Sequence, residues 1–289
     1  MSTPAPERLR AVLPGLVRGL FDDAAVFPPG NATVPDAVAG HRAQRTAWYG
    51  EAVGPLLVRP NQVQELLAAT RAGDDLAVGL VADANAGLAG LLEGALALLD
   101  QEDRARLVQA ETALPSGHDP AAATQVLLDH LTLSVTTYVE MPRTGYVGAL
   151  DALAADGAER AKYRTGGPNA QAVPSQDELA GFLRAALDRR LPFKLTAGLH
   201  HAVRSTTAEG LEQHGFLNVL AAVSAGADGA DAVEMARLLA ERRPDALLGV
   251  LAGADVAAVR GAFVSFGCCG VQDPVADLVA LGLMADAQP

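Results

Sequence analysis

Hydrophobic positions follow two alternating spacings along this chain. Near the N-terminus they recur every three or four residues, and this spacing predicts one amphipathic helix containing Leu9, Val12, Leu13, Leu16, Val17 and Leu20. After it, short apolar runs alternate with turns that contain Gly, Pro, Asn or Asp and with longer segments rich in Ala and Leu. A strand, a turn and a helix in this repeated order are typical of a parallel sheet.

Eight of the apolar runs are strand candidates. They cover residues 24–27, 55–58, 76–81, 106–111, 134–140, 159–164, 192–196 and 262–266. Helices are expected between them, for instance at 35–48, 61–72, 87–100, 177–190 and 212–225, with a last one at 273–284. Between the seventh and eighth strands we expect two helices, the second at 231–243, and an extra strand could form at 247–252.

Nothing in the sequence divides these units into separate domains. No Ser/Gly linker, charge block or change in composition interrupts the chain, so residues 1–289 are predicted to form one domain. Eight β/α units favour a closed (β/α)8 TIM-type barrel, of the α/β class, over an open doubly wound sheet. The first strand is not followed by a GxGxxG motif, which argues against dinucleotide binding. The first helix would cap the N-terminal mouth, and an extra helix would lie between strands 7 and 8.

Alternation along three consecutive strands separates an inward from an outward face, because successive side chains point in opposite directions. In the strand at 192–196 the apolar side chains face outward, which leaves Lys194 and Thr196 pointing into the barrel. The same rule turns further side chains inward from the two preceding strands: Thr136, Tyr138, Glu140, Lys162 and Arg164. These strands therefore direct charge to one place, near the C-terminal mouth where barrel enzymes carry their active sites.

Two interpretations of these inward charges are open. The first is a structural ion-pair network, in which Glu140 and Glu111 balance the cations. Burying an unpaired charge is costly, and three inward cations face only one or two acids, so we favour a functional site. For the strand at 106–111 the register stays open, since either Gln109 or Glu111 could be the polar side chain that matters.

Two lysines on adjacent strands, Lys162 and Lys194, suit one kind of chemistry. The charge of one lysine and partial desolvation both disfavour the ammonium form of the other, so one amine can be neutral near pH 7. A neutral amine condenses with a carbonyl group to form a Schiff base. The iminium then acts as an electron sink when a neighbouring carbon–carbon bond is made or broken.

The segments AERAKYRTGG (158–167), PFKLTAGLHHAVR (192–204) and FGCCG (266–270) carry a family resemblance. They are similar to the sixth strand, the seventh strand and the last turn of class I deoxyribose-phosphate aldolases, so the resemblance covers residues 159–270. It implies that Lys162 forms the imine, that Lys194 lowers its pKa, and that Glu140 or Glu111 moves protons. No cofactor and no metal ion are required.

The same resemblance implies that the turns after the last three strands hold the substrate. The last turn is similar in placement to one that binds phosphate at a helix N-terminus, a site that suits any anion. The expected substrate-binding residues are Arg164, Thr165, Gly166, Gly167, Thr196, Gly198, His200, His201, Gly267 and Cys268.

Two rival functions belong to other classes. A barrel that binds a small molecule without catalysis would use the inward charges as a stabilising network. A metal-dependent hydrolase could use His200, His201 and His214 together with Glu140, because imidazole and carboxylate groups bind zinc. The chain has no HxH or HxxxH spacing, however, and nearby lysine or arginine side chains would repel a metal ion.

Composition narrows the expected partners. With 34 acidic and 22 basic residues the formal charge is -12, so the surface should repel nucleic acid and anionic lipid. No apolar stretch approaches the roughly 20 residues of a membrane span, and the N-terminus lacks a secretory signal, so we expect a cytoplasmic protein. The expected partner is a small anionic carbonyl compound, and a homo-oligomer is compatible with the sequence.

Overall fold

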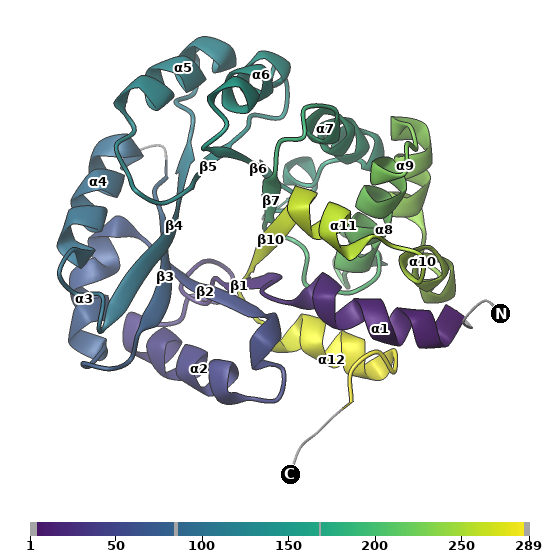
Figure 1. Cartoon of the computed structure of the whole chain (residues 1–289), viewed down its shortest axis with the longest axis horizontal. Helices are drawn as coiled ribbons and strands as arrows, with labels where there is room; N and C mark the ends of the chain where they lie inside the picture. Colours follow the sequence, from purple (N-terminus) through teal and green to yellow (C-terminus); the bar gives the residue numbers. More distant parts are fainter. Residues whose placement is uncertain (1–4, 84–85, 168, 286–289) are drawn as a thin grey trace.

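The strands form a closed parallel barrel (Figure 1). This computed structural model describes residues 5–83, 86–167 and 169–285. The barrel strands are β1 (Phe21–Asp23), β2 (Val53–Val58), β3 (Leu76–Val81), β4 (Ala105–Ala113), β5 (Thr137–Glu140), β6 (Arg160–Arg164), β7 (Phe193–Thr196) and β10 (Phe263–Cys268). Because β1 pairs with both β2 and β10, the sheet closes on itself, and the predicted (β/α)8 barrel is confirmed.

Helices surround the barrel (Figure 1). The described α-helices are α1 (Ala5–Val17), α2 (Val34–Thr46), α3 (Val63–Ala69), α4 (Gly87–Leu98), α5 (Pro120–His130), α6 (Val147–Asp156), α7 (Gln176–Asp188), α8 (Phe216–Ala227), α9 (Ala232–Ala240), α10 (Pro244–Leu251), α11 (Val256–Ala262) and α12 (Gln272–Ala280). Short 3-10 helices are η1 (Gly50–Ala52), η2 (Pro60–Gln62) and η3 (Ala170–Ala172). None of the described helices has the length and apolar character of a membrane span.

The predicted apolar stripe of the N-terminal helix is present in α1. Its side chains Leu9, Leu13, Leu16 and Val17 are buried. The helix contacts α10 and α11, and Figure 1 shows it beside them at the side of the barrel. The contacts of this helix therefore lie mainly with neighbouring helices.

Aromatic packing fixes the outward faces of β6 and β7. The ring of Tyr163 stacks on Phe182 of α7 with centroids 4.3 Å apart, and Phe182 meets Phe193 of β7 edge to face at 5.6 Å. Both strand residues are buried against the helical layer. Because strand side chains alternate, this packing turns Lys162 and Lys194 inward, as the sequence pattern predicted.

The first strand is not where the sequence pattern placed it. The pattern predicted residues 24–27, but these form a turn in which Phe27 N donates to Ala24 O at 2.8 Å. The actual strand, β1, carries the adjacent acids Asp22 and Asp23, and both are buried. A search for apolar runs misses such a strand because its carboxylates are buried through specific partners.

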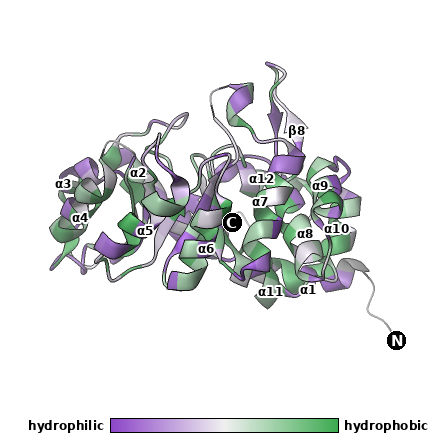
Figure 2. Cartoon of the chain, turned by 90° about the horizontal axis from the view of Figure 1, so that it is seen from above, coloured by the Kyte–Doolittle hydropathy of each residue, from purple (hydrophilic) through white to green (hydrophobic). Residues whose placement is uncertain are grey.

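The insertion between β7 and β10 is also larger than expected. It holds four helices, α8 to α11, and a hairpin of β8 (Ser205–Thr206) and β9 (Glu212–Gln213), instead of the two helices predicted. Residues 247–252, considered as an extra strand, lie mostly in α10, which starts at Pro244. Proline suits a helix start because the first turn needs no N–H donor. Figure 2 shows β8 standing above the helices on one side of the molecule.

Candidate active site

Six charged side chains from five strands form one connected set inside the barrel, which we call the charge network. Its members are Asp22 (β1), Glu111 (β4), Glu140 (β5), Lys162 and Arg164 (β6), and Lys194 (β7). The parallel register explains the meeting, because Glu140 pairs with Lys162 across β5 and β6, and Lys162 pairs with Lys194 across β6 and β7. Side chains at paired positions of neighbouring strands face the same way.

Lys194 occupies the fully buried end of the network. Its ammonium group bonds to Asp22 and to Glu111 Oε1, the latter at 2.5 Å, and lies 5.2 Å from the centroid of the Tyr138 ring. Burial by itself lowers the pKa of this lysine, but the charges of Asp22 and Glu111 outweigh burial and raise it. Lys194 is therefore a paired cation without exposed surface.

Lys162 is placed between two carboxylates. Its Nζ atom lies 2.7 Å from Glu111 Oε2 and 2.9 Å from Glu140 Oε2, while Arg164 Nε bonds to the other oxygen of Glu140 at 3.0 Å. Burial lowers the pKa of Lys162, and the two carboxylates more than reverse that effect. The expected lowering of this pKa by Lys194 is therefore wrong, because Glu111 lies between the two ammonium groups and binds both.

The choice between Gln109 and Glu111 on β4 is settled by their contacts. Glu111 is the acid that meets both lysines, and although burial raises its pKa, Lys162 and Lys194 lower it to about 2. Gln109 also faces inward, and its Nε2 donates to Asp22 Oδ2 at 2.9 Å. Ser265 Oγ donates to the same oxygen at 2.9 Å.

Asp22 is the member of the network that was not among the expected site residues. The first strand was predicted at 24–27 and lies at Phe21–Asp23, so the pattern placed Asp22 before the strand. With Asp22 included, three acids face three cations, so the network is balanced rather than cationic. The available signal was a pair of acids flanked by Phe21 and two alanines, which is unusual in a solvated loop.

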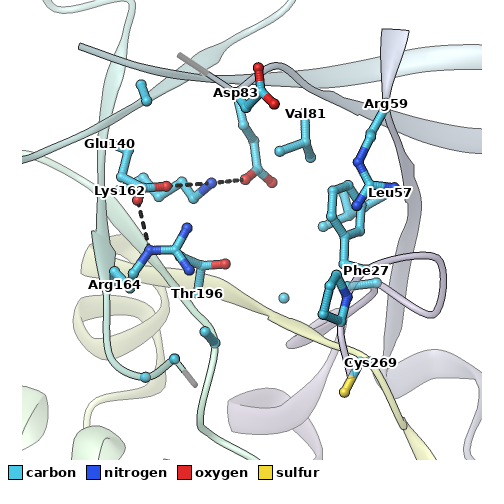
Figure 3. A pocket seen from close by; sticks show the side chains of 18 of the residues that line it. Phe27, Leu57, Arg59, Val81, Asp83, Glu140, Lys162, Arg164, Thr196 and Cys269 are labelled. Carbon is cyan, nitrogen blue, oxygen red and sulfur yellow. Dashed lines mark hydrogen bonds and ion pairs between the residues drawn. The ribbon is translucent and has the colours of Figure 1, made fainter. Parts of the chain in front are cut away.

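A cavity of about 1510 Å³ opens at the C-terminal ends of the strands. Lys162, Glu111, Glu140 and Arg164 line it, whereas Lys194 does not. Figure 3 shows Lys162, Glu140, Arg164 and Thr196 together on one side, with Phe27, Leu57 and Arg59 across the space. Both lysines are buried, at 4% and 0% exposure, but only Lys162 lines the cavity.

The remaining expected binding residues divide into two groups. Those that line the cavity are Gly166, Gly167, Thr196, Gly198, His200 and Gly267. Three others do not: Thr165 is buried and its hydroxyl donates to Thr196 O and Ala197 O, His201 pairs with Asp277 at 3.2 Å, and the Cys268 thiol donates to Gly270 O. The neighbouring thiol, Cys269, lines the cavity instead.

The three histidines considered as metal ligands each contact a different partner. His200 lies 3.8 Å from the Cys269 sulfur, and His201 pairs with Asp277. His214 bonds through Nε2 to Pro174 O at 2.7 Å, and burial lowers its pKa to about 4. Within the described ranges no three His, Cys, Asp or Glu side chains are arranged to hold a metal ion.

Comparisons with known proteins add no further constraint. No family model, curated protein or solved structure matches this chain.

Proposed function

We propose that this barrel is a Schiff-base enzyme, in which Lys162 condenses with the carbonyl group of a small anionic compound. The observation that carries the proposal is the position of Lys162, whose amine lines the cavity and contacts two carboxylates at 2.7 and 2.9 Å. Carboxylates at this distance can take a proton from the amine and return it.

The distribution of lysine supports the proposal. Of the 22 basic residues only Lys162 and Lys194 are lysines, and the others are arginines. Both lysines are in the charge network. A guanidinium group is always charged and forms bidentate ion pairs well, so arginine can supply a fixed charge, which is all that buried Lys194 is assigned here. The choice of lysine is therefore informative at Lys162, which lines the cavity. An amine is needed where nitrogen must lose a proton and become a nucleophile.

The raised pKa of Lys162 is consistent with this chemistry when charges are followed through the reaction. The ammonium group transfers one proton to Glu140, the neutral amine adds to the carbonyl carbon, and a proton moves from the nitrogen of the adduct to its oxygen to give a hydroxyl group. Glu140 then protonates the hydroxyl group of the adduct, which leaves as water, and a positively charged iminium remains. Ammonium and iminium carry the same charge, so carboxylates that stabilise one also stabilise the other.

The two carboxylates have different expected roles. Glu140 is the proton carrier, because it lines the cavity and its side chain is 17% exposed. Glu111 contacts both lysines and positions them. Burial raises the pKa of each acid and the neighbouring cations lower it by more, so exposure to the cavity, and not the pKa, separates the two roles. Arg164 binds the anionic group of the substrate, because its side chain is 48% exposed beside Glu140.

The test is reductive trapping. The protein is incubated with aldehydes and 2-oxo acids, reduced with borohydride and digested, and the adducts are located by mass spectrometry. We expect a reduced adduct on Lys162 and none on Lys194, which serves as an internal control. Lys162→Arg keeps the charge but cannot form the adduct, and Glu140→Gln should slow labelling at least tenfold. Absence of any adduct on Lys162 across the compounds would overturn the proposal.

The balance of three acids and three cations favours a second candidate, a barrel that binds a small molecule without reacting with it. Balanced buried pairs are equally consistent with a structural role. Saturable binding of an unmodified carbonyl compound, combined with no trapped adduct on Lys162, would establish this candidate.

A further inference from the structure

The cavity floor has two chemically different halves. At the strand ends it is lined by Gly267 (β10), Ala24 (after β1), Leu57 (β2), Val81 (β3), Glu111 and Ala113 (β4), Glu140 (β5), Lys162 and Arg164 (β6), and Thr196 (β7). Those from β4 to β7 are polar or charged except Ala113. Gly267, Ala24, Leu57 and Val81 are apolar or lack a side chain, and together these form what we call the apolar half.

Close contacts connect three residues of the apolar half. A Cβ atom added to Gly267 would lie 3.6 Å from Leu57 Cδ1 and 3.9 Å from Ala24 Cβ, and 3.5 Å from Thr196 Oγ1 at the border with the polar half. On the neighbouring strand, Gly79 is the register partner of Leu57, and a Cβ atom there would collide with Leu57 Cδ2 at 2.5 Å. The Leu57 side chain therefore lies over β3 on the barrel interior and forms the middle of this surface.

The wall above the apolar half is mixed. Phe27, Pro28, Pro29 and Pro60 line the cavity, and so do the polar residues Arg59, Asn61, Gln64 and Asp83. The guanidinium group of Arg59 lies 4.5 Å above the Phe27 ring. Figure 3 shows Phe27 and Leu57 facing Lys162 and Arg164 across the open space. A ligand bound only to the charged half would leave this surface in contact with water.

We propose that the substrate is amphipathic: a 2-oxo acid or related carbonyl compound whose reactive end meets Lys162 and Arg164, and whose apolar side chain rests on Gly267, Ala24, Leu57 and Val81. This inference rests on the proposed function for the reactive end. The cavity of about 1510 Å³ leaves room for an apolar side chain beyond the reactive end.

The test compares two ligands that share the same reactive end. Pyruvate and 4-methyl-2-oxopentanoate both carry a carboxylate and a ketone, but only the second has a branched apolar side chain. We expect 4-methyl-2-oxopentanoate to bind at least about tenfold more tightly by titration calorimetry, because it buries additional apolar surface. Equal affinities, or no binding of either compound, would overturn the inference.

Variants locate the preference within the cavity. Gly267→Val fills the apolar half and should reduce the affinity ratio of the two ligands to below about threefold. Gly267→Ala, whose Cβ makes ordinary contacts of 3.5 to 3.9 Å, serves if the valine variant does not fold, and should lower the ratio less. Ala113→Val is the matched control, because it adds methyl groups beside the charged half and should leave the ratio unchanged. A ratio that survives both Gly267 substitutions would contradict the inference.

Borohydride trapping separates the two proposals. A tenfold affinity ratio without an adduct on Lys162 would reject the Schiff-base function and retain the apolar half as a binding surface. An adduct on Lys162 with both compounds, but equal affinities, would retain the function and reject the amphipathic substrate.

Discussion

Asp22 is the acid on which buried Lys194 most depends. It binds the ammonium group directly and accepts hydrogen bonds from Gln109 and Ser265, each at 2.9 Å. Asp22→Asn should destabilise the protein by about 3–5 kcal/mol, because one partner of a buried pair is removed while the other stays charged. Chemical denaturation of the variant measures this loss. The double variant Asp22→Asn/Lys194→Met should recover most of it, and a loss below about 1 kcal/mol in the single variant would contradict the role assigned to Asp22.

Glu111 should make stability depend on acid. Its pKa falls from the ordinary value of 4.5 to about 2 in the folded protein. Between these two values the unfolded chain binds a proton at this residue and the native state does not. The stabilisation is complete above the unfolded pKa and is lost as the pH falls from about 5 to about 2, with a slope up to ~1.4 kcal/mol per pH unit. Denaturation curves across this range measure the slope. Glu111→Gln should flatten it, and an unchanged slope would refute the assignment.

The inward direction of Lys162 and Lys194 could be predicted from sequence, because alternation along a strand is a local property. Their protonation could not, because it depends on Asp22 and Glu111, which lie on β1 and β4 far away in the chain. The scarcity of lysine was a usable signal that composition alone displays. It marks both positions without any knowledge of the fold.

Two glycines hold the turns after β6 and β7 together. A Cβ atom on Gly166 would lie 2.7 Å from Gly198 Cα, and one on Gly198 would lie 2.9 Å from Gly166 Cα. Gly198 also has φ +81, in the left-handed region. Gly198→Ala should therefore destabilise the protein by about 1–3 kcal/mol and reduce trapping at Lys162, because the turns lining the cavity must separate.

A helical glycine provides the control for this substitution. Gly249 lies in α10 with nothing within 4 Å of an added Cβ atom, so Gly249→Ala should stabilise the protein by up to about 1 kcal/mol. Thermal or chemical denaturation compares the two variants. Equal effects of the two substitutions would argue that close approach of the turns does not matter.

Helices and strands could be predicted from the sequence where apolar side chains account for their burial. β3 spans the predicted residues 76–81, and its run of apolar residues needs no distant partner. β1 escaped prediction because its two acids are balanced by residues elsewhere in the fold, among them Lys194 and His41. The insertion after β7 was underestimated because its apolar residues also suit strands, and only packing among helices separates the two outcomes.

The net negative charge of the protein should slow the association of an anionic substrate. The chain carries a formal charge of -12, and exposed Asp83, Glu93 and Glu209 line the cavity. We expect the association rate of an anionic 2-oxo acid to rise several-fold between 10 and 150 mM salt, as the screening length falls from about 30 to about 8 Å. Stopped-flow measurements test this, with a neutral aldehyde as the control. A rate that falls with salt would show that Arg59 and Arg164 dominate the local field.

Because both lysines lie inside the barrel, their rates of modification by an amine reagent measure how often the fold opens. Arginine supplies every other basic side chain, so Lys162 and Lys194 carry the side-chain amines that an acylating reagent can modify. Lys162, which is 4% exposed, lines the cavity. Lys194 has no exposed surface and can be acylated only when neighbouring strands separate. Timing the two modifications by peptide mapping would therefore gauge local and global opening of the fold in a single unlabelled sample.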